Sequence, residues 1–353
     1  MLFGRENAPA LRPVGNKPVH ARSNPLAPLT RSGTRDPRAL QQKPSKASSL
    51  AHPVRAKGRV RAKGTRSRRV HNLPEAHSSS TAAMRLYVVR HAQSANNALL
   101  VPSLMNPDRD ADPTLTEAGF KQAAALGKYV AEEFGEKAAA LGRIKPCHAV
   151  KKLVVSPMRR CMLTATPISK QLGIPIRVKQ DIHEHGGCFD GAADRPGGVI
   201  GRPGLSKPQL EAEFPGCVVP LELMKGWWSE EQGCETVPQA QERVVRVTEW
   251  LWEQATKWKE KDGALMIVVH GMFIDILIKA LSGATLTAGK QNIAFCSQNA
   301  GIHVLELKPG TDANPGNVAG LQMFNIVDHL PPNIRTGGSV EGLDDCYMNE
   351  GSA

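Results

Sequence analysis

Three short apolar runs in this sequence end in residues that can carry charge or protons. These residues are arginines and histidines: Arg90 and His91 after LYVV, Arg159 and Arg160 shortly after KKLVV, and His270 after ALMIVV. Apolar runs of this length that are rich in valine are typical of buried strands. Ligands bind outside the carboxyl ends of parallel strands, so we expect these side chains to meet in one crevice.

A crevice of this composition suits a phosphoryl group. Guanidinium forks match the geometry of phosphate oxygens and stabilise their charge during transfer. A histidine with one unprotonated ring nitrogen can attack phosphorus and hold the group as a covalent intermediate. The departing oxygen needs a proton. Glu184, in DIHEHGGCFDG, is the best candidate donor, because the glycines after it let the backbone approach a ligand closely.

Glu184 has a second interpretation as part of a metal site, because His183 and His185 flank it. Adjacent side chains on a strand or loop point apart, however, and the spacing places no third ligand beside them. The sequence therefore indicates neither a metal nor an organic cofactor, and proton donation is the favoured role for Glu184.

The segments that must position these residues alternate between strand and helix from Arg85 onward. Two long stretches repeat apolar residues every three to four positions: Ala123, Leu126, Val130 and Phe134 after a predicted N-cap at Thr116, and Val244, Val247, Leu251, Ala255 and Trp258 after Pro238. Two further strands are expected in NAGIHVLEL and MFNIVDHLPP. The alternation predicts a three-layer α/β/α sandwich with a mostly parallel central sheet.

Residues 1–83 differ in composition from everything that follows. Residues 1–82 hold 17 Lys and Arg against three acidic residues, which is about +14, whereas the whole chain carries +12. The remainder is therefore slightly acidic. Because the leader is basic and has no apolar signal core, we expect it to be disordered. We expect the folded domain to span residues 84–335, followed by a flexible tail at 336–353.

The basic leader resembles an organelle transit peptide, with the chloroplast favoured over the mitochondrion. Its internal repeat, VRAKGR then VRAKGT, leaves three alternatives open. The basic cluster could contact nucleic acid or act as a nuclear address, and it could equally be an inert linker in a cytoplasmic protein. We expect the transit peptide, and we favour a small substrate over nucleic acid as the partner.

The seven cysteines and the longest apolar run indicate the redox state of the compartment and whether the chain spans a membrane. The cysteines form no CxxC pair and no regular spacing, which indicates free thiols in a reducing compartment. The apolar run from Ala264 is interrupted by His270, Asp275 and Lys279, so we expect no membrane span. The last two of these residues, four positions apart, are most simply a pair on one helix face.

Several other residues have structural interpretations. Trp227 and Trp228 fit either a substrate pocket or the core, and the core is favoured. Asp112 fits a turn before proline, or support for the site. Asn299 and His329, near the predicted last strands, are expected to be structural.

Five segments, in this order, resemble the histidine phosphatase superfamily, also called phosphoglycerate mutase-like: RHAQSANN, DPTLTEAGFKQA, SPMRRCMLTA, HEHGG and VVHGMFIDILIKALSG. The ordered set covers roughly residues 84–335 and is specific, although each segment alone is weak. The resemblance implies an α/β/α sandwich in which each site residue has a role: His91 is phosphorylated, Arg90, Arg160 and His270 contact the phosphate, and Glu184 donates the proton.

The same resemblance selects two residues that spacing alone leaves open. It favours Arg160 over Arg159, because the arginine of SPxxRA lies four residues after the serine. It places Asn97 at the asparagine of RHGxxxxN, on the phosphate side. Three positions depart from the family pattern: Ala92 replaces the usual glycine, Cys161 the usual alanine, and Leu163 the usual glutamine.

The resemblance implies a phosphatase that hydrolyses a small phosphate monoester through a phosphohistidine. A phosphoglycerate mutase is the nearest alternative, but mutases follow the acid with a segment like ERHYGxLxG. Here EHGGCFDGAAD supplies neither the arginine nor the tyrosine. A non-catalytic interaction or nucleic-acid-binding protein that acts through its leader is the other alternative. The retention of the complete set of site residues argues against it.

Overall fold

Six strands form the central sheet of the computed structural model, which describes residues 82–339 apart from 101–105, 191–197 and 285–292. The sheet has the order β3-β2-β6-β1-β7-β8. The strands are β1 (Met84–Arg90), β2 (Val150–Val155), β3 (Ile176–Val178), β6 (Ala264–Val269), β7 (Ile302–Lys308) and β8 (Val318–Ile326). The first four are parallel, whereas β7 and β8 run antiparallel to their neighbours. A separate pair, β4 (Phe189–Asp190) and β5 (Ile200–Gly201), is antiparallel.

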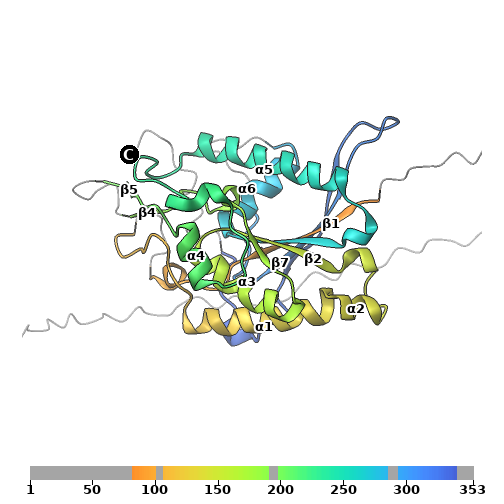
Figure 1. The fold of residues 1–353 in the computed structure, drawn as a ribbon, viewed down its shortest axis with the longest axis horizontal. Coiled ribbons are helices and arrows are strands. Elements are labelled where there is room, and N and C mark those ends of the chain that lie inside the picture. The colour runs from red at the N-terminus through yellow and green to blue at the C-terminus, as the bar shows by residue number, and fades with distance from the viewer. Residues whose placement is uncertain (1–81, 101–105, 191–197, 285–292, 340–353) are drawn as a thin grey trace, which may run out of the picture. The chain divides into compact units, whose positions relative to one another are not determined.

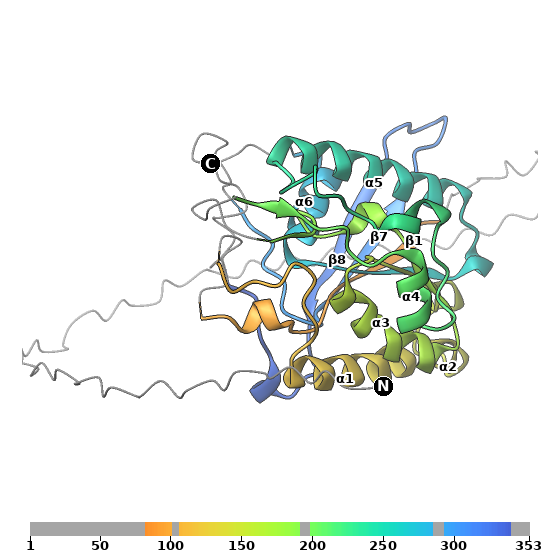
Figure 2. The same cartoon turned by 60° about the vertical axis from the view of Figure 1, so that its left-hand side comes forward.

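Helices cover both faces of this sheet (Figures 1 and 2). They are α1 (Glu117–Phe134), α2 (Glu136–Ala140), α3 (Arg159–Leu172), α4 (Lys207–Glu213), α5 (Val237–Lys257) and α6 (Gly271–Leu281). One apolar core joins α1 and α3 to one face, and a second joins α5 and α6 to the other. The predicted three-layer α/β/α sandwich with a mostly parallel sheet is therefore confirmed.

Alternation along β1 explains how one strand serves both cores. Tyr87 and Val89 belong to the core beneath α1 and α3, whereas Leu86 and Val88 belong to the core beneath α5 and α6. Successive side chains of a strand point to opposite faces, so a strand in the middle layer must be apolar throughout. The last residue of β1, Arg90, therefore ends a strand that is fixed on both sides.

The predicted helix starts are also present. Thr116 caps α1 by accepting a hydrogen bond from the backbone N–H of Gly119 at 3.0 Å. The stripe of α5 is buried as predicted, although Trp258 lies one residue beyond the helix. Asp275 and Lys279 form the predicted pair at 2.7 Å. Both side chains are buried rather than exposed, because α6 is apolar around most of its circumference.

Residues just beyond 335 contact the loop before β7. The Thr336 carbonyl accepts a hydrogen bond from the backbone N–H of Asn299 at 2.9 Å, and Gly337 pairs with Gln298. The predicted leader lies outside the described residues except for its last two, and so does the tail beyond residue 339. All described residues belong to one unit, Glu75–Ala353. No helix among them is long and apolar enough to cross a bilayer.

The contact between α1 and α3 depends on a glycine. A Cβ atom at Gly127 would lie 2.8 Å from both the carbonyl carbon and the Cβ of Pro167, in the middle of α3. Alanine normally favours a helix over glycine by about 1 kcal/mol. At this position, however, the extra methyl overpacks two buried backbones, so we expect Gly127→Ala to lower the free energy of unfolding by about 1–3 kcal/mol.

Chemical denaturation of the full chain measures this effect. The control is Lys128→Ala, at the next position of the same helix, where the side chain is 74% exposed. The control should change the free energy of unfolding by less than about 0.5 kcal/mol. An unchanged or raised stability of Gly127→Ala would contradict the close approach of the two helices.

Candidate active site

The carboxyl ends of β2, β6 and β1 lie side by side and carry the residues singled out in the sequence. Val155 of β2 pairs with Val268 of β6, and Val269 of β6 pairs with Arg90 of β1. The rings of His91 and His270, which directly follow β1 and β6, have centroids 5.2 Å apart. The predicted meeting of the strand ends is therefore present.

The ring of His91 is oriented by two hydrogen bonds. Arg160 Nε donates to His91 Nε2 at 3.3 Å, so Nε2 is an acceptor and carries no proton. The proton is therefore on Nδ1, which lies 2.7 Å from the carbonyl oxygen of Ala92 and donates to it. His91 is 2% exposed. Its unprotonated nitrogen thus points toward the arginine, which is the orientation that a nucleophile toward phosphate requires.

Burial and charge keep His91 neutral. Burial is the largest cause that holds its pKa well below 6.5, and the positive charges of Arg160 and Arg90 lower it further. The hydrogen bond to the Ala92 carbonyl opposes this shift without reversing it. Near neutral pH, the ring therefore keeps the lone pair on Nε2.

His270 is buried beside His91 and faces α3. Its Nε2 lies 2.7 Å from Ser156 Oγ and 3.3 Å from Cys161 Sγ. Burial and Arg160 hold its pKa well below 6.5 as well. Cys161, one of the departures from the family pattern, therefore adds a weak polar contact to this histidine. Burial also raises the pKa of the Cys161 thiol, so the sulfur stays protonated.

The Arg90 guanidinium lies in a narrow space lined by glycine. A Cβ at Gly271 would come within 3.1 Å of Arg90 Nε, and one at Gly337 within 2.6 Å of Nη1. Nη1 donates to the Ser297 carbonyl, whereas Nε is buried and has no hydrogen-bond partner among the described residues. Burial lowers the pKa of Arg90, and so does Arg160. An anion placed between the two arginines would relieve both effects.

Glu184 lies at the N-terminus of α6. Its Oε1 accepts hydrogen bonds from the backbone N–H groups of Phe273 at 2.9 Å and His185 at 3.0 Å, and its Oε2 accepts one from Met272 at 3.4 Å. The positive end of a helix favours a carboxylate there. Glu184 also acts electrostatically on Arg90, so its carboxyl group lies within reach of the same site.

Asn97 is linked to His91 through Asn299, which we expect from the sequence to be structural. Asn299 Nδ2 donates to the His91 carbonyl at 3.1 Å and to Asn97 Oδ1 at 3.2 Å. Thr336 Oγ1 donates to Asn299 Oδ1 at 3.0 Å. Asn299 thus connects the loop after β1 to Thr336, and no local sequence pattern indicates this role.

Ala92 does not need the freedom of the glycine that it replaces. Among the described residues only two other than glycine have a left-handed backbone, and Ala92 is neither of them. Its N–H donates to Thr164 Oγ1 at 3.0 Å, and Thr164 donates to the Arg160 carbonyl at 2.7 Å. The turn after His91 is therefore tied to the helix that carries Arg160.

The tryptophan pair supports the Glu184 segment. Trp227 and Trp228 are buried, as expected for core residues, and their rings lie 5.5 and 5.0 Å from that of His183. A Cβ at Gly187 would lie 2.4 Å from the Trp228 ring. These contacts fix the HEHGG segment against the body. No group of three or more His, Cys, Asp or Glu in the described part of the chain could hold a metal ion.

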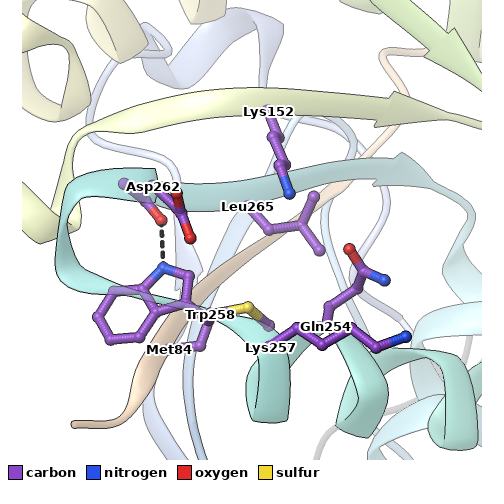
Figure 3. Close-up of a pocket in the computed structure, with 8 residues that line it drawn as sticks. Met84, Lys152, Gln254, Lys257, Trp258, Asp262 and Leu265 are labelled. Atoms are coloured by element: carbon purple, nitrogen blue, oxygen red, sulfur yellow. Dashed lines mark hydrogen bonds between the residues drawn. The ribbon is translucent and has the colours of Figure 1, made fainter.

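A cavity of about 50 Å³ lies at the opposite end of the sheet (Figure 3). It is lined by the starts of β1 and β6, at Met84 and Leu265, and by Trp258, whose Nε1 donates to the Gly263 carbonyl at 2.7 Å. The cavity holds little more than a water molecule or two. It is remote from the strand ends that carry the histidines.

Solved structures that resemble this chain include several hydrolases. Three examples are mycobacterial hydrolase 2 (19% identity, TM-score 0.44, 72% of this chain and 95% of that one), a mycobacterial glucosyl-3-phosphoglycerate phosphatase (22%, 0.41, 69% and 99%) and a phosphoserine phosphatase from Entamoeba histolytica in complex with 3-phosphoglyceric acid (16%, 0.38, 70% and 99%). No curated protein matches the chain.

The α/β/α fold brings two histidines and two arginines together near the carboxyl ends of β1, β2 and β6. The family model of the histidine phosphatase superfamily (branch 1) matches residues 86–196 and 204–313, which is more than half of the chain. The chain belongs to the histidine phosphatase superfamily.

The neutral state of His91 can be observed directly. Because burial and two arginines lower its pKa, we expect the ring to stay neutral and protonated on Nδ1 when the pH falls through 6.5. Two-bond proton–nitrogen NMR spectra of histidine-labelled protein report this tautomer, and a His91→Gln variant assigns the signal. A ring protonated on both nitrogens at pH 6.5 would contradict the geometry.

Asp112 gives a second pH-dependent signal beside the site. Its Oδ1 accepts a hydrogen bond from the Arg159 N–H at 2.9 Å, whereas Oδ2 is buried with no partner among the described residues. Burial raises the pKa of Asp112 from 3.8 to about 6, although Arg160 opposes the shift. Between about pH 4 and about pH 6, the folded state keeps a proton on Asp112 that the unfolded chain releases. The stability linked to this proton is fully present below about pH 4 and is lost as the pH rises to about 6.

Asp112→Asn removes this titration. We expect the free energy of unfolding of the wild type, relative to that of the variant, to fall as the pH is raised across this window. Urea denaturation at pH 4.5 and pH 7 measures the difference. A difference that is constant, or that grows with pH, would show that the Asp112 carboxyl is not enclosed as described.

Proposed function

We propose that this protein is a phosphatase that hydrolyses a small phosphate monoester through a phosphohistidine at His91. The observation that carries the proposal is the neutral His91 ring, with Nδ1–H bound to the Ala92 carbonyl and Nε2 facing Arg160. A nucleophile needs its lone pair available beside the phosphate site, and this arrangement supplies it without a separate base.

In the first step, His91 Nε2 attacks phosphorus while the bond from phosphorus to the ester oxygen breaks. Arg90 and Arg160 would contact the transferring oxygens and stabilise their charge, with Asn97 and His270 beside them. The ester oxygen leaves with a proton from Glu184.

In the second step, water attacks the phosphohistidine. Glu184, now ionised, accepts a proton from the water as the bond from nitrogen to phosphorus breaks, and inorganic phosphate leaves. The His91 ring returns to its neutral state, and Glu184 is protonated again. The cycle therefore needs only the side chains of the site and water.

The phosphohistidine is the intermediate to be trapped. With p-nitrophenyl phosphate, we expect a burst of p-nitrophenol and a phosphohistidine at residue 91 after rapid quenching. His91→Ala should lose the phosphoprotein and lower turnover by about 10³-fold or more. His148→Ala is the matched control, because His148 precedes β2 at the opposite end of the sheet. Turnover by His91→Ala equal to that of the control would refute the mechanism.

A panel of phosphate esters separates hydrolysis from transfer. Assayed with and without 2,3-bisphosphoglycerate, the protein should release inorganic phosphate in both conditions. Transfer to an acceptor hydroxyl without phosphate release would instead assign the site to a mutase.

A further inference from the structure

A buried ion pair lies behind the segment that carries Glu184. Arg243 of α5 donates from Nε and Nη2 to the two oxygens of Glu235, both at 2.6 Å. Their side chains are 4% and 5% exposed. Burying two charges loses their hydration, so a pair of this kind is weak evidence for stability and calls for another explanation.

The remaining polar groups of the pair contact the backbone on both sides of Glu184. Arg243 Nη1 donates to the Asp181 carbonyl at 2.8 Å and to the His183 carbonyl at 3.1 Å. The Glu235 N–H donates to the Gly186 carbonyl at 3.0 Å. The pair therefore binds the backbone before and after Glu184 without contacting the Glu184 carboxyl group.

The side chain of His185 adds a further contact between the Glu184 segment and Glu235. Its Nδ1 lies 3.3 Å from Glu235 Oε2. Burial alone would raise the pKa of Glu235, but hydrogen bonds from Arg243 and His185 hold it well below its usual range. Glu235 thus stays ionised across the neutral range and balances the charge of Arg243.

The same guanidinium also contacts the helix that receives the Glu184 carboxylate. Arg243 Cζ lies 5.4 Å from the ring centroid of Phe273, and the Phe273 N–H donates to Glu184 Oε1 at 2.9 Å. One side chain thus touches both the segment that carries the carboxyl group and the helix end to which it is bound. The distance between the Glu184 segment and the N-terminus of α6 therefore determines the position of the Glu184 carboxyl group.

We infer that the Glu235–Arg243 pair positions the Glu184 carboxyl group for proton transfer to the leaving group, which makes both residues positioning residues. The inference rests on the proposed function, since it assigns Glu184 as the acid. The inference predicts a defect that depends on the leaving group of the ester. Loss of the pair should slow phosphohistidine formation from esters whose leaving oxygen needs a proton, and should spare esters whose leaving group departs as a stable anion.

Single-turnover measurements with two probes test this selectivity. Glycerol 2-phosphate has an alkoxide leaving group, whereas p-nitrophenyl phosphate releases a stabilised phenolate. For Arg243→Met, we expect the rate constant of phosphohistidine formation from glycerol 2-phosphate to fall by about 10²-fold or more, as for loss of general acid catalysis. With p-nitrophenyl phosphate, the same rate constant should stay within about threefold of the wild type.

Three further variants keep the test decisive. Arg243→Lys and Glu235→Gln retain part of the contacts and should show smaller losses with the same selectivity, even if Arg243→Met does not fold. Arg246→Met, three residues along α5 at an exposed position, is the matched control and should behave like the wild type with both probes.

The outcomes separate this inference from the proposed function. Equal losses with both probes in the folded variants, or no loss with either, would overturn the positioning role and leave the phosphohistidine mechanism intact. Absence of phosphohistidine in the wild-type protein with both probes would overturn the mechanism and the positioning role together.

Discussion

A hydrogen bond from His91 Nδ1–H to the Ala92 carbonyl is the interaction on which the rest of the site depends. A histidine beside two buried guanidinium groups must stay neutral, and a neutral ring has only one proton to place. Because that proton is engaged with the backbone, the other nitrogen faces the arginines as an acceptor. The fold maintains this arrangement from both sides: Thr164 contacts the Ala92 N–H, and Asn299 contacts the His91 carbonyl.

The second constraint is the balance of charge. Arg160 lowers the pKa of Arg90. Arg160 is buried, and the Nε atom of Arg90 is shielded from solvent. Glu184 offsets part of this charge, and Asp112 accepts a hydrogen bond from the N–H of Arg159, the residue before Arg160. A phosphate dianion would balance the remaining positive charge of the two arginines.

Much of the fold could be predicted from the sequence, because strand ends and helix stripes are local patterns. The valine runs of β1, β2 and β6 indicate the sheet, and the residues after them indicate where the site lies. The contacts that hold the site in place are harder to predict from the sequence. Asn299 gains its role only when β7 lies beside β1, and Gly337 approaches Arg90 only because the chain returns to the site after β8. Neither position carries a signal before the topology is known.

The Glu235–Arg243 pair shows the same limit for α5. Its apolar stripe predicts the helix, but Arg243 lies one position before that stripe, and only the folded structure shows that its charge is buried behind the Glu184 segment. A charged residue next to an apolar stripe was the one available signal. Such a signal indicates a partner without identifying it.

A crystal structure in complex with orthovanadate tests the central claim most directly, because five-coordinate vanadate resembles the transition state of phosphoryl transfer. The account predicts vanadium bonded to His91 Nε2, with its oxygens within hydrogen-bond distance of Arg90, Arg160 and His270. Vanadate held elsewhere, or held in this site with His91 Nε2 still bonded to Arg160, would contradict it.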